Sequence, residues 1–210
     1  MNVNNFKTII CLLDVGMGTN HFGNLLSTSD LIAPRVAVID YHDYLINEYT
    51  KKTDNAHIAS IRGFTTLDKD DNQHIINTAT KPYVLAGHIT GFWGAKNIIT
   101  SFGNFLVFLG QATELNYQLA KRTAYLNYPL AKRTAYIEKF LTMYNPSFLV
   151  NNLGISENNI IAFDPNLLFS SNITKLIEVL NAKSNLNLDI KFCQELHDIW
   201  WNKIILKSLI

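Results

Sequence analysis

Short apolar runs alternate with segments of helical periodicity along most of the chain. The first run, Thr8 to Leu13, stops at Asp14; two glycines follow, and an apolar-periodic segment begins at Asn20. This order is typical of a strand, a tight loop and a helix. Further strands are predicted from the β-rich runs at 35–41, 83–90, 104–110 and 159–163.

Segments with helical spacing lie between and after these runs, and helices are predicted at 41–51, 91–103, 173–182 and 190–207. Strands that alternate with helices form parallel sheets covered on both faces. We therefore expect one α/β domain, in which helices flank a central, mainly parallel sheet. The 210 residues are long enough for one sizeable core and too short for two comfortable domains. The polar segment 53–81 has no sustained period, so we expect a surface excursion that could cover a substrate.

An internal repeat occupies residues 115–136. LNYQLAKRTAY is followed at once by LNYPLAKRTAY, with Gln118 replaced by Pro129 as the one difference. Such fidelity indicates a recent in-frame duplication, since the units of ancient repeat proteins are longer and more numerous. Eleven residues are close to three helical turns, so the copy keeps the same face. Proline disrupts a helix interior, so we expect a break near residues 126–128.

Composition narrows the classes of partner. Hydrophobic residues make up 48% of the chain and charged residues 17%, with a formal net charge of +1. These values favour neither disorder nor a basic surface for nucleic acid, so a small-molecule partner is expected. Cys11 and Cys193 fit buried thiols of a reducing compartment better than a disulfide. No run approaches the roughly 18 apolar residues of a membrane span, and the N-terminal run is too short for a signal peptide. We expect a cytoplasmic protein without membrane contact.

The loop after the first strand is the first candidate site. Glycines let the backbone approach a ligand closely, and amide groups at a helix start attract anions such as phosphate or sulfate. Gly16, Gly18, Thr19 and Asn20 would form this site, and His21 could add a charge. Three plainer interpretations stay open: a turn that binds nothing, Thr19 and Asn20 as N-caps only, and a solvated His21.

His88 is the second candidate. Ligands of open α/β sheets collect at the carboxyl ends of strands, where both the glycine loop and Gly87-His88 are expected to lie. A base at this position could face an anion held by the loop. The alternative is a core histidine that bonds to the backbone. The other histidines show no spacing typical of a metal site, and no metal is expected.

The order of these segments resembles the PAPS-dependent sulfotransferases. GMGTNHFGNLL, with Gly18-Thr19 and the leucine pair 25–26, is similar to the family's loop for the donor's 5′ sulfophosphate. YVLAGHIT resembles the strand that ends in the catalytic histidine, and NFLVFLG resembles the strand before the 3′-phosphate site. The resemblance implies a P-loop-like sulfotransferase fold. It also implies transfer of a sulfuryl group from PAPS to a hydroxyl or amine of a small-molecule or glycan acceptor, with His88 as the base.

The chain departs from the family pattern at two places. Gly16 stands where the family has a basic loop residue, and Gly110 and Gln111 follow the third strand where the family has an arginine. The nearest downstream cations are in the Lys121-Arg122 pair, so Arg122 is the candidate for the 3′-phosphate. A second hypothesis is a catalytically degraded relative that binds an anionic ligand or a partner without turnover. A P-loop kinase is disfavoured because the Walker lysine is absent.

Overall fold

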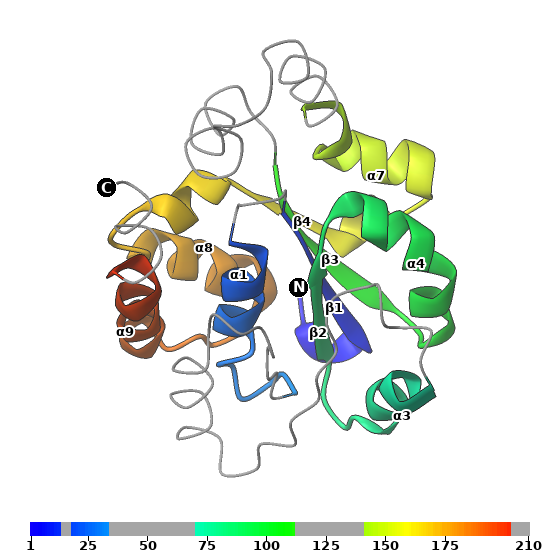
Figure 1. Ribbon diagram of the computed structural model, residues 1–210, viewed down its shortest axis with the longest axis horizontal. Coiled ribbons are helices and arrows are strands. Elements are labelled where there is room, and N and C mark those ends of the chain that lie inside the picture. Colours follow the sequence, from blue (N-terminus) through cyan, green and yellow to red (C-terminus); the bar gives the residue numbers. More distant parts are fainter. Residues whose placement is uncertain (14–17, 34–69, 112–140, 203–210) are drawn as a thin grey trace.

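Four parallel strands form the centre of the structure, a computed structural model that describes residues 1–13, 18–33, 70–111 and 141–202 (Figure 1). The strands are β1 (Thr8–Leu12), β2 (Tyr83–Gly87), β3 (Phe105–Gly110) and β4 (Ile160–Phe163), in the spatial order β2-β1-β3-β4. The expected α/β class and parallel sheet are confirmed. The strand predicted at 35–41, the helix at 41–51, and the repeat at 115–136 lie outside the described residues.

Helices and short 3₁₀ turns connect the strands. The α-helices are α1 (Thr19–Leu26), α3 (Asp70–Thr78), α4 (Ile89–Ser101), α7 (Pro146–Leu153), α8 (Thr174–Ser184) and α9 (Ile190–Trp200). The 3₁₀ turns are η1 (Val3–Asn5), η3 (Glu157–Asn159) and η4 (Pro165–Phe169).

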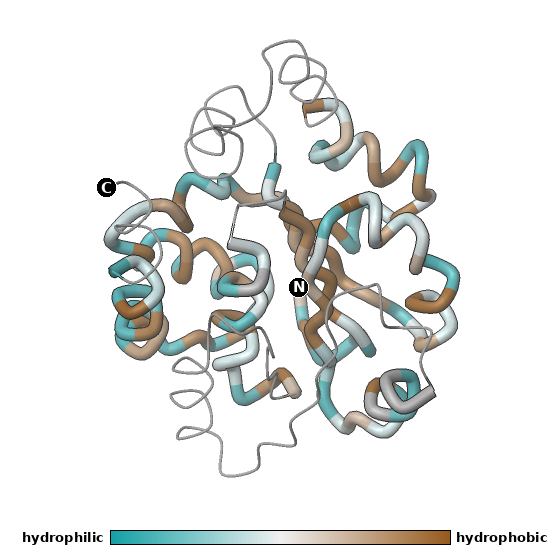
Figure 2. Tube along the Cα trace, viewed as in Figure 1, coloured by the Kyte–Doolittle hydropathy of each residue, from teal (hydrophilic) through white to brown (hydrophobic). Residues whose placement is uncertain are grey.

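The strands are buried because both faces of the sheet are covered. All five residues of β1 are buried, and Ile9 pairs with Val84 on one side and Leu106 on the other. The strands accordingly form the most hydrophobic part of the trace (Figure 2). A continuous apolar run is what a parallel strand between two helix layers requires.

The helices form two layers. α1, α8 and α9 lie on one side of the sheet, and α3, α4 and α7 lie on the other (Figure 1). The chain runs from β1 outward to β2, then returns across β1 to β3. Because right-handed crossovers in opposite directions use opposite faces, α1 and α4 are separated by the sheet. The carboxyl ends of β1 and β3 flank the point where the direction reverses, which is where ligands of such sheets bind.

Several predicted boundaries need correction. The strand predicted at 83–90 ends at Gly87, because Ile89 and Thr90 already belong to α4. The helix predicted at 190–207 ends as an α-helix at Trp200, although residues 203–207 lie outside the described part. Helix α7 was not predicted, yet its ends carry ordinary signals. The Asn145 side chain accepts from the Ser147 N–H, Pro146 opens the helix, and Gly154 closes it with a positive φ.

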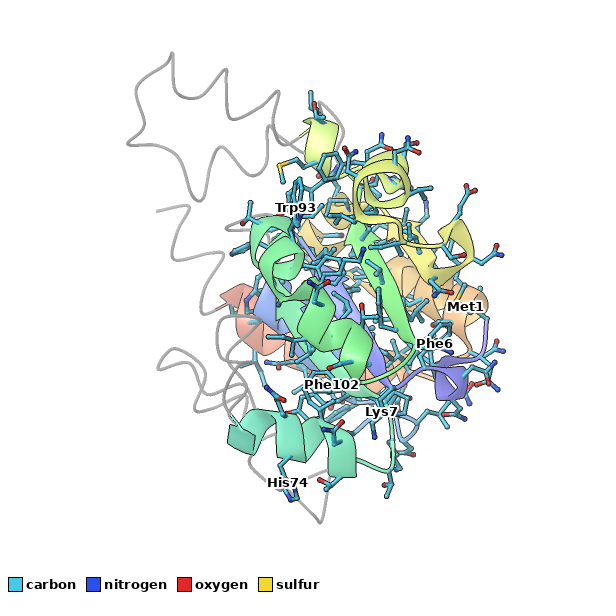
Figure 3. All side chains as sticks on the ribbon, turned by 90° about the vertical axis from the view of Figure 1, so that its right-hand side faces the viewer. Met1, Phe6, Lys7, His74, Trp93 and Phe102 are labelled. Atoms are coloured by element: carbon cyan, nitrogen blue, oxygen red, sulfur yellow. The ribbon has the colours of Figure 1, made fainter. Side chains whose placement is uncertain are left out.

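Helix α3 is a second unpredicted element, and it occupies the end of the polar segment 53–81. Its Ile76 side chain is fully buried. Lys7 Nζ donates to the carbonyl groups of Asn77, at 3.1 Å, and Ala79, at 2.7 Å, so a cation meets the C-terminal end of the helix. Lys7 lies between α3 and α4 in Figure 3. The polar composition concealed this helix, for which the described contacts are the buried Ile76 side chain and the hydrogen bonds from Lys7.

Both cysteines are buried thiols, Cys11 on β1 and Cys193 on α9, and no disulfide joins them. This agrees with the expectation from the sequence. Within the described ranges, no helix has the length and apolar character needed to cross a membrane.

Candidate functional site

The carbonyl oxygen of Leu13, directly after β1, accepts hydrogen bonds from side chains of three segments. His88 Nδ1 lies 2.9 Å from it, the Tyr144 hydroxyl 3.2 Å, and Thr19 Oγ1 3.4 Å. Since a carbonyl oxygen only accepts, all three groups donate to it. The end of β1 and the starts of α1 and α4 are thereby joined, with the segment before α7, at the carboxyl edge of the sheet.

His88 is held at this edge in a defined orientation. It is the N-cap of α4, with extended backbone angles, and its ring is half-buried. Because Nδ1 carries the proton that is donated to Leu13, the neutral ring has a deprotonated Nε2. A deprotonated ring nitrogen at the carboxyl edge is what a general base needs. The geometry fits both expectations for His88, the base and the backbone-bonded histidine, so the catalytic role stays a prediction.

Tyr144 is a site residue that the sequence did not indicate. It is 3% exposed, and its hydroxyl accepts from the Ile89 backbone N–H at 3.2 Å while it donates to Leu13. The amide groups in the first turn of a helix have no carbonyl partner within the helix. The Tyr144 hydroxyl therefore caps α4 at the residue beside His88. Local patterns cannot reveal this contact, because 131 residues separate Tyr144 from Leu13.

Gly18 is the N-cap of α1 in the left-handed conformation, with φ 70°. A Cβ atom at this position would lie 3.1 Å from Cζ2 of Trp200 and 3.3 Å from Cδ2 of Leu168. Glycine is therefore favoured twice, by the left-handed backbone angle and by the close approach of α9 and η4. Gly18, which is predicted to let an anion approach the backbone, thus lets the Trp200 indole approach it.

The other loop residues are placed differently from their expected roles. Thr19 is the first residue of α1 and not its N-cap; its hydroxyl is buried and donates to Leu13. His21 is 1% exposed, so the interpretation as a solvated residue is wrong. Its ring points toward α9. Gly16 and Arg122 lie outside the described residues, as does the side chain of Asn20. Anion binding by these residues remains a prediction.

His21 and His197 form a buried pair, here called the histidine couple, between α1 and α9. Their nearest nitrogens, Nε2 of His21 and Nδ1 of His197, are 3.2 Å apart. His197 Nε2 lies 2.8 Å from the Ser170 carbonyl oxygen and must donate to it. In the neutral couple His197 Nδ1 is therefore the acceptor, and His21 donates through Nε2. The indole of Trp200 stacks on the His21 ring at 4.3 Å with the planes 6° apart.

Burial lowers the pKa of His197 below its usual value near 6.5. Desolvation of the charged ring is the largest cause, and it outweighs the hydrogen bond to Ser170 and the nearby charge of Asp198, which both raise the pKa. The His197 ring is 0% exposed. At neutral pH it is therefore uncharged, which fits the hydrogen-bond directions given above.

The structure thus brings some predicted residues together and separates others. Thr19 and His88 meet at Leu13, whereas His21 faces the opposite way, into the contact with α9. Four described lysines donate to backbone carbonyl groups: Lys7, Lys81, Lys96 and Lys183. In the described part of the chain, no cluster of three or more histidine, cysteine or acidic side chains is arranged to hold a metal ion.

Comparison with family models, with curated proteins and with solved structures finds no match to this chain.

Proposed function

We propose that this chain is a sulfotransferase-like protein with a P-loop-like fold, and that it transfers a sulfuryl group from PAPS to a hydroxyl or amine. The observation that carries the proposal is the orientation of His88. Its Nδ1–H donates to the Leu13 carbonyl at the carboxyl edge, which leaves Nε2 as a proton acceptor beside the strand–loop–helix joint. The parallel sheet and the glycine N-cap of α1 support the same assignment.

In the proposed reaction, the acceptor oxygen or nitrogen attacks the sulfur of PAPS. The bond from sulfur to the bridging oxygen breaks, and that oxygen leaves on the desulfated nucleotide. His88 Nε2 takes the proton that the acceptor loses. Backbone N–H groups at the start of α1 would stabilise the sulfuryl and phosphate oxygens, so most of the rate enhancement would come from positioning and charge stabilisation.

Tyr144 would act as a positioning residue in this scheme. Its hydroxyl bridges the Ile89 N–H and the Leu13 carbonyl, the same carbonyl that orients His88. A base must be held within hydrogen-bond reach of the proton that it removes. Tyr144 would therefore act on the reaction through His88, and it would not itself touch the substrate.

A second candidate function is binding of an anionic ligand without turnover. The observation that favours it is the engagement of the loop side chains with the protein. Thr19 donates to Leu13, and His21 bonds to His197, so neither side chain is directed at a ligand. In addition, Gly16 stands where the sulfotransferases that the loop resembles have a basic residue. Binding would then depend on backbone amide groups and on whatever charge other segments supply.

Calorimetry of the full chain with PAPS, its desulfated product and ATP tests both candidates. The sulfotransferase proposal expects PAPS and the desulfated nucleotide to bind, ATP to bind weakly or not at all, and desulfated nucleotide to appear in a mixed acceptor panel. Binding of PAPS without product would favour the second candidate. A chain that binds none of the three ligands would overturn both.

A further inference from the structure

The histidine couple is a titratable cluster that the proposed reaction does not use. His21 lies on α1 and His197 on α9, 176 residues apart in the sequence. Both rings are buried, at 1% and 0% exposure, and they contact Trp200. Because two titratable groups share one hydrogen bond in a buried contact, the number of protons they hold determines whether the contact can persist.

The neutral couple forms a directed chain of hydrogen bonds. His21 donates to His197, and His197 donates to the Ser170 carbonyl, so each ring carries one proton in a fixed position. A first additional proton leaves this chain intact, because the contact between the rings needs only one hydrogen. The resulting cation lies against the face of Trp200, which is a favourable site for a positive charge.

A second additional proton cannot be accommodated in the same geometry. Both facing nitrogens, 3.2 Å apart, would then carry hydrogen, and neither could accept. The two rings would also be adjacent cations in a buried place, where like charges repel strongly. The doubly protonated couple must therefore separate.

The described elements packed around the couple carry few charged side chains, and those of α8, which packs against α9, are Lys175, Glu178 and Lys183. Asp198 is the charged group that acts on His197, and it favours protonation. Helix α1 carries no acidic or basic residue besides His21, and η4 carries none. On α9, Lys191 and Glu195 are the remaining charged side chains. Of the two carboxylates on α9, Asp198 and Glu195, Asp198 is the one that acts on His197.

We infer that the histidine couple is a proton-sensitive contact between α1 and α9, which persists with at most one added proton and opens when both rings are protonated. Trp200 connects this event to the candidate site. Its indole stacks on the His21 ring and also fills the space beside Gly18, the N-cap of α1. When α9 separates from α1, the start of α1 loses the side chain that supports it. The inference does not depend on the proposed sulfuryl transfer.

The test is a pH titration of the full chain followed by NMR of the histidine ring nitrogens and of the Trp200 indole N–H. We expect His21 and His197 to titrate in two coupled steps, because interacting sites have shared macroscopic pKa values. The Trp200 indole resonance should shift in the second step, while the far-ultraviolet circular dichroism is retained. Independent titration of the two rings, with no Trp200 shift, would overturn the inference.

The variant His21→Gln gives a matched comparison, because its side-chain N–H can still donate to His197 but does not titrate. We expect a single titration step and a Trp200 resonance that stays constant across the pH range in which the wild-type couple opens. His74→Gln is the control, since His74 is exposed on α3 and points away from the sheet (Figure 3). It should behave as wild type. A Trp200 shift in His21→Gln at the wild-type pH would also overturn the inference, and His197→Gln replaces His21→Gln if the latter does not fold.

Discussion

At the scale of single residues, the Leu13 carbonyl determines what His88 can do. The strand end presents an oxygen that must be satisfied, and the His88 ring supplies an N–H at 2.9 Å. This bond assigns the tautomer, so the opposite nitrogen can accept a proton. Gly18 is constrained in two ways, because its positive φ and its close contact with Trp200 both disfavour a side chain.

The variant His88→Asn should separate the catalytic from the structural role. The asparagine N–H can occupy the place of Nδ1 and donate to Leu13, but no group replaces Nε2. We expect PAPS affinity and the free energy of unfolding to stay near wild type, and sulfuryl transfer to fall by about 10²–10⁴-fold. Single-turnover product release and urea denaturation measure these quantities. A loss of about 1–3 kcal/mol in stability with proportionate loss of activity would instead indicate a structural histidine.

The variant Gly18→Ala should destabilise the protein. A left-handed backbone costs an L-residue roughly 1–2 kcal/mol, and the added Cβ would press on Trp200 at 3.1 Å. We therefore expect a decrease of at least about 1 kcal/mol in the free energy of unfolding, measured by urea denaturation. Gly94→Ala, within α4, is the matched control, because a Cβ atom there would meet no atom within 4 Å apart from its chain neighbours and the backbone of its own helix. That variant should gain about 0.5–1 kcal/mol; equal effects at both positions would contradict the assigned role of Gly18.

At the scale of elements, short helices depend on their end contacts. α7 has eight residues, too few for a stable isolated helix, and both ends are capped. The Asn145 side chain accepts from the Ser147 N–H at 2.9 Å, and Gly154 adopts a positive φ at the other end. Tyr144 directly precedes this cap, so the position of α7 and the hydroxyl beside His88 are linked through one backbone segment.

The variant Asn145→Ala should weaken α7 and the contact that Tyr144 makes. Loss of an N-cap costs about 0.5–2 kcal/mol, typically near 1. We expect this decrease in the free energy of unfolding. We also expect faster hydrogen exchange of the Ile89 N–H, which donates a hydrogen bond to the Tyr144 hydroxyl. Asn152→Ala, an exposed position on the same helix, is the control and should change stability by less than about 0.5 kcal/mol. Unchanged hydrogen exchange of the Ile89 N–H in Asn145→Ala would show that α7 does not affect the contact between Tyr144 and Ile89.

In the whole molecule, an early helix, α1, and a late one, α9, meet at the histidine couple. α1 follows the first strand, α9 is the last described helix, and the couple and Trp200 pack them together on one side of the sheet (Figure 1). A buried, uncharged His197 makes this contact sensitive to pH. The unfolded chain accepts a proton on His197 near pH 6.5, whereas the folded chain accepts it only at lower pH.

Stability should therefore rise with pH through this range. Between the folded and unfolded pKa values the unfolded state holds more protons, so the free energy of unfolding increases with pH by up to about 1.4 kcal/mol per pH unit for this group. The contribution of His197 is complete above about pH 6.5 and is lost as the pH falls toward the folded pKa. Urea denaturation at pH 5–8 measures it, and His197→Gln should flatten the dependence. If the free energy of unfolding of His197→Gln depends on pH as steeply as that of the wild type, the pH dependence does not come from His197.

Patterns along the sequence predict the parallel α/β class, the approximate positions of β1 to β4, and the meeting of Thr19 and His88 at one edge of the sheet. These features depend on local periodicity, on chain order and on the rule that parallel strands share a carboxyl edge. Local signals for α7 are also present in the sequence, at Asn145, Pro146 and Gly154.

Packing between segments distant in the sequence determines which atoms the candidate residues contact. His21 follows the loop and reads as a solvated residue, yet α9 covers it from 176 positions away. The Tyr144 hydroxyl bonds to Leu13, which lies 131 positions away in the sequence, so no local pattern of residues indicates the contact. The physical reason is common to both. The direction of a side chain is set by the element packed against it, and that packing depends on how the whole chain folds around the sheet.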